Sequence, residues 1–210
     1  MKEINIIDFG LMGKQISALF YLLGYEIGVY NKSKLNIYEF EKQIKLLQRK
    51  IDFSNFNAGK INIYQHIEDL KNSLTIESLN EDLNLKKEIM QILRDNNIVF
   101  SNSSSLSMDD LNCDFIHFFN TIYIKLIELC GSNLERFTPL KDLKKLGFHI
   151  ICSKGNRGAL ANLLLFNEIS SFFKIIEKYD YNFKECQTVY DLLYEKRNLL
   201  NIIDTIGIEL

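Results

Sequence analysis

A glycine turn between two apolar stretches constrains the fold of this chain more than any other feature. The apolar stretch Ile4–Ile7 comes first, and Gly10 and Gly13 follow it. Residues 16–23 then have the apolar spacing of a helix, and a second apolar stretch spans Tyr25–Tyr30. A strand, a tight turn, a helix and a parallel strand form the unit that places a dinucleotide diphosphate at a helix N-terminus. The sequence therefore predicts a doubly wound α/β fold of the Rossmann type.

The turn departs from the usual G-x-G-x-x-G pattern at its first position. In that pattern the first glycine makes the turn, the second lets the backbone approach the diphosphate, and the third lets the helix pack on the strand. Gly10 and Gly13 hold the second and third places, whereas Asp8 holds the first. A carboxylate repels a diphosphate, so Asp8 either points away or weakens binding, and a domain that has lost its nucleotide is the alternative. The cofactor contacts that we predict here are Gly10, Leu11, Met12 and Gly13.

The end of the second predicted strand bears on the choice of cofactor. An NAD site usually carries an acidic residue there, which holds the ribose hydroxyls. This chain has Asn31, followed by Lys32, Ser33 and Lys34. A missing carboxylate and two ammonium groups suit a 2′-phosphate better than a bare ribose, although a solvated turn explains the segment equally well. We expect NAD or NADP as the cofactor, with Asn31 and Lys32 among its contacts.

Composition argues against several classes of partner. The 210 residues include 25 Lys and Arg against 27 Asp and Glu, and this balance indicates neither a nucleic-acid nor a membrane partner. The four cysteines form no C-x-x-C pair, so we expect no metal site and no disulfide framework. The chain begins with a strand rather than a signal peptide, and its longest apolar stretch is interrupted by polar residues. We therefore expect a cytoplasmic protein.

Strand and helix patterns alternate along the first 154 residues. Helices are predicted over residues 35–50 and 80–95, with Lys86 and Lys87 on the exposed face of the second. Further strands are predicted at residues 61–64, 74–77, 97–100, 115–120 and 125–129. This alternation predicts a mostly parallel sheet whose ligands collect at the carboxyl ends of its strands. We expect a nucleotide-binding domain at residues 1–154 and a reduced, all-helical domain at residues 155–210.

Polar residues near the ends of these strands are candidates for chemistry. Ser101–Ser105 place hydroxyls and an amide just past one strand, although serines also cap helices. His117 lies in an aromatic strand, where a lone histidine is more often a core residue. Glu128 lies in the next apolar strand, where burial is costly unless a group such as His117 pairs with it. Such a pair beside hydroxyls suits proton transfer; a Ser-His-Glu acyl-transfer triad is the alternative, which the missing nucleophile elbow disfavours.

Six short segments, in family order, resemble the short-chain-length 3-hydroxyacyl-CoA dehydrogenase family. They are Gly10–Ile16, Ile76–Leu83, Ser101–Leu106, His117–Asn120, Lys125–Glu128 and Asn162–Leu164. The resemblance implies reversible hydride transfer between NAD(P) and carbon 3 of a 3-hydroxyacyl thioester. The acyl group would be carried by CoA or by an acyl carrier protein.

The same resemblance implies roles for single residues. His117 is implied to be the catalytic acid/base, with Glu128 as its orienting partner. Ser104 is implied to donate a hydrogen bond to the reacting oxygen, and Asn162 to help hold the substrate carbonyl. The residues implied to lie near the nicotinamide are Glu77 and Asn102.

The chain also departs from the family pattern. Thr121 stands where the family has proline, Leu163 replaces an arginine, and the hairpin that contacts CoA is reduced. A long helix predicted over residues 157–179 opens the family's C-terminal domain, whose last helices are expected to be absent. Apolar residues around Phe172 and Phe173 would then need a partner chain, so we expect a homodimer or other oligomer through these helices. The alternatives to an active enzyme are a catalytically weak or inactive nucleotide-binding or regulatory relative, and a structural subunit of another enzyme.

Overall fold

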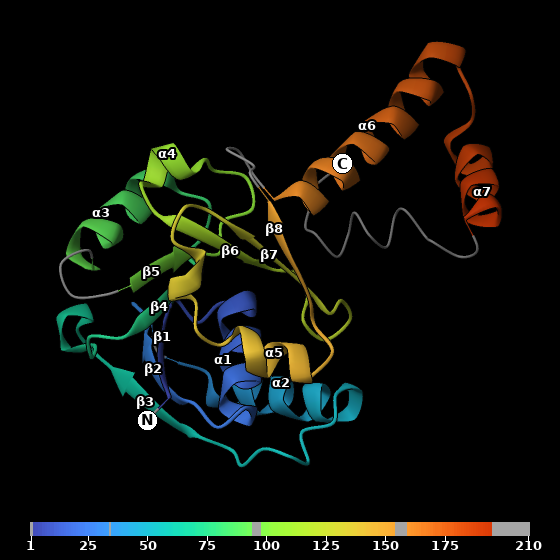
Figure 1. Ribbon diagram of the computed structural model, residues 1–210. Coiled ribbons are helices and arrows are strands. Elements are labelled where there is room, and N and C mark those ends of the chain that lie inside the picture. The colour runs from blue at the N-terminus through green and yellow to red at the C-terminus, as the bar shows by residue number, and fades with distance from the viewer. Residues whose placement is uncertain (1, 34, 94–97, 154–158, 195–210) are drawn as a thin grey trace. The chain divides into compact units, whose positions relative to one another are not determined.

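The computed structural model describes residues 2–33, 35–93, 98–153 and 159–194 (Figure 1). Contacts divide the chain into two compact units, Met1–Leu160 and Ala161–Leu210. The predicted domain boundary after residue 154 lies outside the described residues. No helix in the described ranges is long and apolar enough to cross a membrane.

A sheet of eight strands forms the centre of the first unit. Its order is β3-β2-β1-β4-β5-β6-β7-β8, and all neighbours are parallel except β6 and β7. The predicted doubly wound, mostly parallel sheet is therefore confirmed. The strands are β1 (Glu3–Ile7), β2 (Glu26–Tyr30), β3 (Lys60–Tyr64), β4 (Leu74–Glu77), β5 (Ile98–Ser101), β6 (Asp114–Phe118), β7 (Leu126–Cys130) and β8 (His149–Ser153).

Helices cover both faces of this sheet (Figure 1). Ile4 and Ile6 of β1 pack in the core with α1 and α2, whereas Ile7 packs in a second core with α3. Side chains of one strand thus alternate between two cores, as a strand buried on both sides requires. The first face carries α1 (Leu11–Leu22), α2 (Ile37–Lys50), η2 (Leu134–Arg136) and α5 (Leu140–Lys145), and the second carries η1 (Ile67–Asp69), α3 (Leu83–Leu93) and α4 (Met108–Leu111).

The strand order reverses between β1 and β4. From β1 the chain moves outward through β2 to β3, and from β4 it moves outward in the other direction. Ligands of such sheets bind at the carboxyl ends of the strands beside this reversal. The segments that follow β1, β4, β5 and β6 meet at this edge, which is therefore where the candidate site has to be sought.

Gly13 allows α1 to approach the turn that follows β1. A Cβ atom at Gly13 would lie 2.1 Å from the backbone carbonyl oxygen of Asp8, which no side-chain rotation can move away. A Cβ atom at Gly10 would meet only the Asp8 side chain, at 2.9 Å. We expect Gly13→Ala to lower the free energy of unfolding by about 1–3 kcal/mol, and Gly10→Ala to lower it less. Urea unfolding of both variants checks this; an equal or smaller loss in Gly13→Ala would contradict it.

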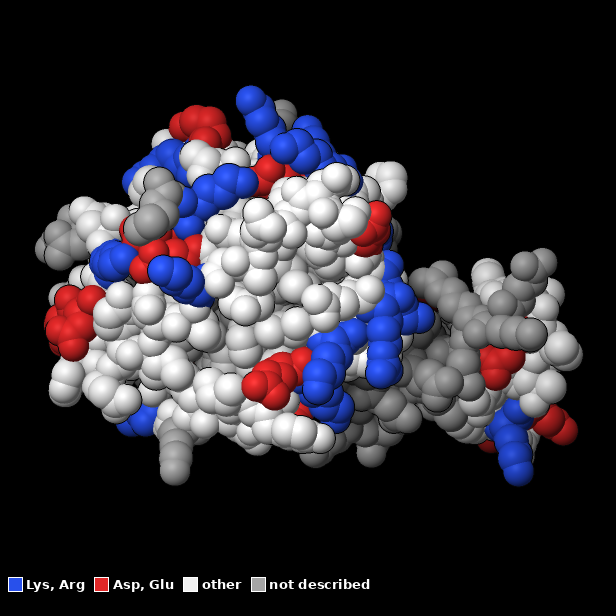
Figure 2. Space-filling model, turned by 90° about the horizontal axis from the view of Figure 1, so that it is seen from below, with Lys and Arg blue, Asp and Glu red and all other residues white. Residues whose placement is uncertain are grey.

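Charged side chains are spread over the surface. On the face that Figure 2 shows, Lys and Arg side chains form several patches, some of them directly beside Asp and Glu side chains, and uncharged surface lies between the patches. The ion pairs of Lys71 with Glu3 and Glu26 join half-exposed and partly buried side chains. Pairs of this kind contribute about 0–1 kcal/mol each, so the fold depends mainly on its apolar cores.

The second unit contains α7 (Phe183–Leu193) and all but the first residue of α6 (Leu160–Tyr179). The predicted C-terminal helices are confirmed for the described residues. Phe172 and Phe173 of α6 contact Phe183 of α7, each at 6.0 Å between ring centroids. The expectation that these two residues need a partner chain is corrected in part, because α7 of the same chain half-buries them.

Candidate active site

The turn after β1 holds an aspartate in a backbone conformation that favours glycine. Asp8 has a φ of 74°, in the left-handed region. Its carboxylate does not point away from the turn, since Oδ2 accepts a hydrogen bond from the N–H of Gly10 at 3.0 Å. The N–H of Phe9 donates to Oδ1 of Asn31 at 2.9 Å. Two N–H groups of the turn are therefore bound by side-chain oxygens of this chain.

Asn31 also organises the loop that follows β2. Its Nδ2 donates to the carbonyl oxygen and to Oγ of Ser33, both at 2.9 Å. Lys32 and Ser33 are exposed, and Lys34 lies outside the described residues. Because both ends of the Asn31 amide are engaged within the chain, Lys32 is the better candidate for a contact with a cofactor ribose or its phosphate. That role stays a prediction.

A buried ion pair lies behind the carboxyl end of β4. Nζ of Lys86 is 2.6 Å from Oε1 of Glu77, and both side chains have almost no exposed surface. Oε2 of Glu77 accepts a hydrogen bond from Oγ of Ser101 at 2.6 Å. The prediction that Lys86 is exposed is wrong, because Glu77 faces α3 from the sheet. The carboxylate of Glu77 is fully buried and bound to Lys86 and Ser101. It therefore holds these two side chains in place and has no exposed surface for a ligand.

Glu81 holds the hydroxyl segment that follows β5. Its Oε1 accepts hydrogen bonds from the N–H of Ser104 at 2.7 Å and from Oγ of Ser104 at 3.2 Å. Oγ of Ser103 donates to the other carboxylate oxygen at 2.6 Å. Burial opposes ionisation, but the hydrogen bonds from Ser103 and Ser104 prevail and hold the pKa of Glu81 below its usual value. Ser104, the predicted donor to a reacting oxygen, therefore lies beside a charged carboxylate.

Asn102 joins the ends of two strands next to the predicted acid/base group. Its N–H donates to the carbonyl oxygen of Glu77 at 2.7 Å, and its Oδ1 accepts from the N–H of Phe118 at 2.8 Å. Phe118 follows His117 directly in β6. Asn102 therefore helps to fix the position of β6. Its contact with a nicotinamide stays a prediction.

His117 and Glu128 lie opposite one another in the antiparallel pair of β6 and β7. Residues directly opposite in such a pair present their side chains to the same face of the sheet. Nδ1 of His117 is buried and has no hydrogen-bond partner among the described residues. Oε1 of Glu128 accepts from the N–H of Leu160, the first residue of α6, at 2.7 Å. The two residues are therefore cross-strand neighbours on one face of the sheet, and their pairing as acid/base and orienting group stays a prediction.

Burial decides the protonation state of His117. It lowers the pKa of His117 from 6.5 to about 4, although the carboxylates of Glu128 and Glu81 favour the charged ring. His117 as a whole is 8% exposed, so the loss of solvation outweighs the attraction of two carboxylates. At neutral pH the ring is uncharged and able to accept a proton.

This shift makes folding stability depend on pH. Between pH 6.5 and pH 4 the unfolded chain binds a proton at His117 that the folded chain does not, so the free energy of unfolding falls as the pH falls through this window. The full effect is about 3 kcal/mol. Urea unfolding at neutral pH and at pH 4 gives the loss in the free energy of unfolding for each protein. We expect this loss to be smaller in His117→Gln than in the parent chain, by about the amount just given. Parallel losses in both proteins would contradict the assignment.

Comparison with known proteins identifies the family. Residues 3–136 match the family model of the 3-hydroxyacyl-CoA dehydrogenase NAD-binding domain. The chain belongs to this family. A 3-hydroxybutyryl-CoA dehydrogenase of Clostridioides difficile is 27% identical over 157 residues, which cover 63% of this chain and 55% of the relative. The chain thus spans about half the length of this curated relative.

Solved structures show the same fold. FadB2 of M. tuberculosis superposes with a TM-score of 0.80 at 19% identity, covering 99% of this chain and 83% of that one. The (S)-3-hydroxybutyryl-CoA dehydrogenase PaaH1 from Ralstonia eutropha also has a TM-score of 0.80, at 21% identity and with the same coverage. The eight-stranded sheet and the helices after it therefore follow the family fold.

NAD(H) is the cofactor of this family domain, and the close packing at Gly13 fits it, whereas Asp8 occupies the N–H of Gly10. Gly13 provides the close approach of helix and turn that the fingerprint requires, and Gly10 and Leu11 at the start of α1 are exposed. The first N–H groups of a helix have no partner within it and are available to an anion. The cofactor contacts that stay predictions are Gly10, Leu11 and Met12 at the diphosphate and Lys32 at the adenosine ribose.

Two residues with contacts at this edge of the sheet were missed by the sequence analysis. Glu81 received no role, although it follows β4 at the edge where ligands were expected. Oε1 of Gln15, on α1, accepts from the N–H of Thr121 at 3.2 Å in a fully buried position. The proline that the family has in place of Thr121 lacks this N–H, so the departure at Thr121 supplies a bond between the cofactor helix and the loop after His117. Asn162 lies on α6 in the second unit, and its part in substrate binding stays a prediction.

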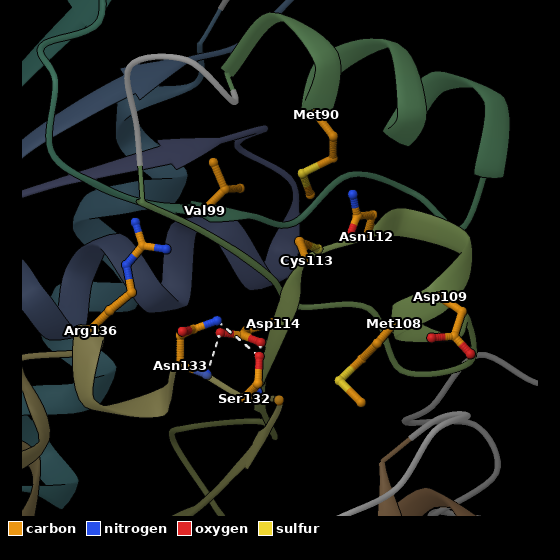
Figure 3. Close-up of a pocket in the computed structure, with 11 residues that line it drawn as sticks. Met90, Val99, Met108, Asp109, Asn112, Cys113, Asp114, Ser132, Asn133 and Arg136 are labelled. Atoms are coloured by element: carbon orange, nitrogen blue, oxygen red, sulfur yellow. Dashed lines mark hydrogen bonds between the residues drawn. The ribbon is translucent and has the colours of Figure 1, made fainter.

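A cavity of about 480 Å³ lies at the opposite edge of the sheet (Figure 3). Its lining includes Cys113 and Asp114 at the start of β6, whereas His117 lies near the other end of that strand. Asp114 accepts hydrogen bonds from the N–H groups of Ser132 and Asn133 at 3.0 and 3.1 Å. Burial raises the pKa of Cys113 to about 12, so this thiol is not a nucleophile at neutral pH. The cavity is therefore separate from the candidate acid/base site.

Proposed function

We propose that this chain catalyses reversible hydride transfer between NAD(H) and carbon 3 of a 3-hydroxyacyl thioester, with His117 as the acid/base. The observation that carries the proposal is the buried side chain of His117, which lies directly opposite Glu128 in the adjacent strands β6 and β7 at the ligand edge of the sheet. Burial also lowers the pKa of His117, so that the ring is uncharged at neutral pH. The family match and the name of the Clostridioides difficile relative support the substrate class.

When bound, NAD(H) supplies the hydride acceptor or donor. In the oxidation direction, the neutral ring of His117 accepts the substrate hydroxyl proton on the ring nitrogen that carries no proton. The carboxylates of Glu128 and Glu81 stabilise the imidazolium that forms, since both favour the charged ring. In the reduction direction the same nitrogen returns the proton to the alkoxide oxygen.

The remaining residues position the substrate. Oγ of Ser104 turns from Glu81 to donate a hydrogen bond to the reacting oxygen, while the N–H of Ser104 keeps its bond to Glu81 and holds the segment in place. Asn162 binds the thioester carbonyl. These assignments follow the family pattern at the matching positions of this chain.

The partners of the chain are proposed from its surface and its family. The thioester arm is CoA or an acyl carrier protein, and the protein is cytoplasmic. Self-association as a homodimer or other oligomer is supported by exposed apolar side chains on the second unit, which include Leu163, Leu164, Phe166, Leu192 and Leu193.

A catalytically weak nucleotide-binding relative is the second candidate function. It is favoured by the contact between Asp8 and Gly10, because a carboxylate at the glycine turn opposes a diphosphate. Such a protein would keep the fold and the site but give no turnover.

Oxidation of NADH and of NADPH in the presence of acetoacetyl-CoA separates the two candidates. The proposal predicts consumption of at least one nucleotide and formation of 3-hydroxybutyryl-CoA, detected by mass spectrometry. A parallel reaction with an acetoacetyl carrier protein tests the other thioester arm. Absence of turnover with both nucleotides and both thioesters would reject the enzyme and favour the second candidate. The nucleotide that gives the higher kcat/KM shows whether the Asn31–Ser33 loop suits a 2′-phosphate or a bare ribose.

A further inference from the structure

The carboxylate of Asp8 borders the space in which the glycine turn is expected to meet a diphosphate. Its Oδ2 accepts the N–H of Gly10 at 3.0 Å. A Cβ atom at Gly10 would lie 2.9 Å from the same oxygen. The second glycine of the fingerprint leaves that space open so that a diphosphate can approach the backbone. In this chain the space is bordered by an anionic oxygen of the protein itself.

Two further features of the turn bear on how it receives an anion. The neighbouring N–H of Phe9 is already bound by Oδ1 of Asn31, so the turn is closed upon itself. Within the described ranges, Asp8 forms no ion pair with a lysine or arginine. Among the described residues, no cation is therefore bound to Asp8 to neutralise its charge before an anion arrives.

We propose that Asp8 is an affinity-determining residue, which competes with the diphosphate of NAD(H) for the N–H of Gly10 and repels it by its charge. The positive end of a helix attracts an anion, and a second anion at the same place is repelled by the first. The carboxylate of Asp8 is part of the chain and therefore always stands at this place. The turn then adds little to cofactor affinity, which comes mainly from the adenosine and nicotinamide ends. The inference rests on the proposed function only in taking NAD(H) as the ligand.

Three variants separate charge, occupancy and general effects on folding. Asp8→Gly removes the carboxylate, and Asp8→Asn removes the charge but keeps an oxygen that can accept from Gly10. Both residues tolerate the φ of 74° at this position, so both variants should fold. Asp180→Gly is the matched control, because Asp180 is also an aspartate in the left-handed region, with a φ of 52°, in the second unit.

The probes are NADH, ADP and adenosine, titrated into each full-length protein by calorimetry at low ionic strength. We expect the dissociation constants of NADH and ADP to fall about tenfold in Asp8→Gly and to fall by a smaller factor in Asp8→Asn. Adenosine, which has no diphosphate, should bind all four proteins equally. Asp180→Gly should match the parent chain with every probe.

An unchanged NADH affinity in Asp8→Gly would overturn the proposal, as would no binding by any of the proteins. An equal gain with adenosine would overturn it too, because the effect would then not act at the diphosphate. A gain in Asp8→Gly with none in Asp8→Asn would contradict the part assigned to charge. These titrations contain no thioester, so a chain that binds NADH more tightly as Asp8→Gly but never reduces acetoacetyl-CoA would support this inference and reject the proposed function.

Discussion

Replacement of His117 by glutamine is expected to lower kcat for acetoacetyl-CoA reduction by about 10²–10⁴-fold, the usual contribution of a positioned acid/base group. Glutamine keeps a polar side chain of similar size but cannot exchange a proton. Because His117 acts on the substrate oxygen and not on the nucleotide, the dissociation constant of NADH should stay within about twofold, a change of less than 0.5 kcal/mol. Steady-state kinetics and calorimetry measure the two quantities on the same preparation.

His149→Gln is the matched control for this prediction. His149 lies on β8, and its side chain is exposed. The control variant should therefore keep the parent kcat. A kcat of His117→Gln within about threefold of the parent would show that another group transfers the proton, since such a loss is far smaller than acid/base groups contribute.

Replacement of Lys86 by methionine is expected to produce the largest loss of stability. The variant leaves the carboxylate of Glu77 fully buried with hydrogen bonds from Ser101 and Leu79 but without a cation. Removing one partner of a buried ion pair costs about 3–5 kcal/mol, because the remaining charge is not compensated. Urea unfolding measures the loss. We also expect Ser104 to shift, because Glu81, which accepts the N–H of Ser104, and Ser101 both lie beside this ion pair.

Two further variants test the cause of this loss. Lys87→Met changes the exposed neighbour on α3 and should alter stability by less than about 0.5 kcal/mol. Glu77→Gln combined with Lys86→Met removes both charges and should regain much of the stability. A double variant as unstable as Lys86→Met would show that packing, rather than the unpaired charge, causes the loss.

The sheet was predictable because its strands are continuous apolar runs separated by amphipathic helices. The elements that the sequence analysis missed carry weaker patterns. Helices α4 and α5 span four and six residues, too few for a helical period to emerge. Strand β8 lies at the sheet edge and is mostly exposed, so it lacks the buried run that marks the central strands.

The candidate site was predictable only in part, because its residues come from many separate segments. That His117 and Glu128 are neighbours could be expected from two costly polar residues on adjacent apolar strands. The burial of Lys86 could not, since helical spacing places it beside Lys87 and only the position of Glu77 on β4 explains it. The roles of Gln15 and Glu81 likewise depend on contacts with residues far away in the sequence.

The fate of the hydride tests the central claim most directly. The full-length protein is mixed with acetoacetyl-CoA and with NADH that carries deuterium at the transferable position of the nicotinamide ring. The account predicts 3-hydroxybutyryl-CoA with deuterium at carbon 3, formed by the parent chain and by His149→Gln and strongly reduced in His117→Gln. A product without deuterium at carbon 3, or equal formation by His117→Gln and the parent, would contradict it.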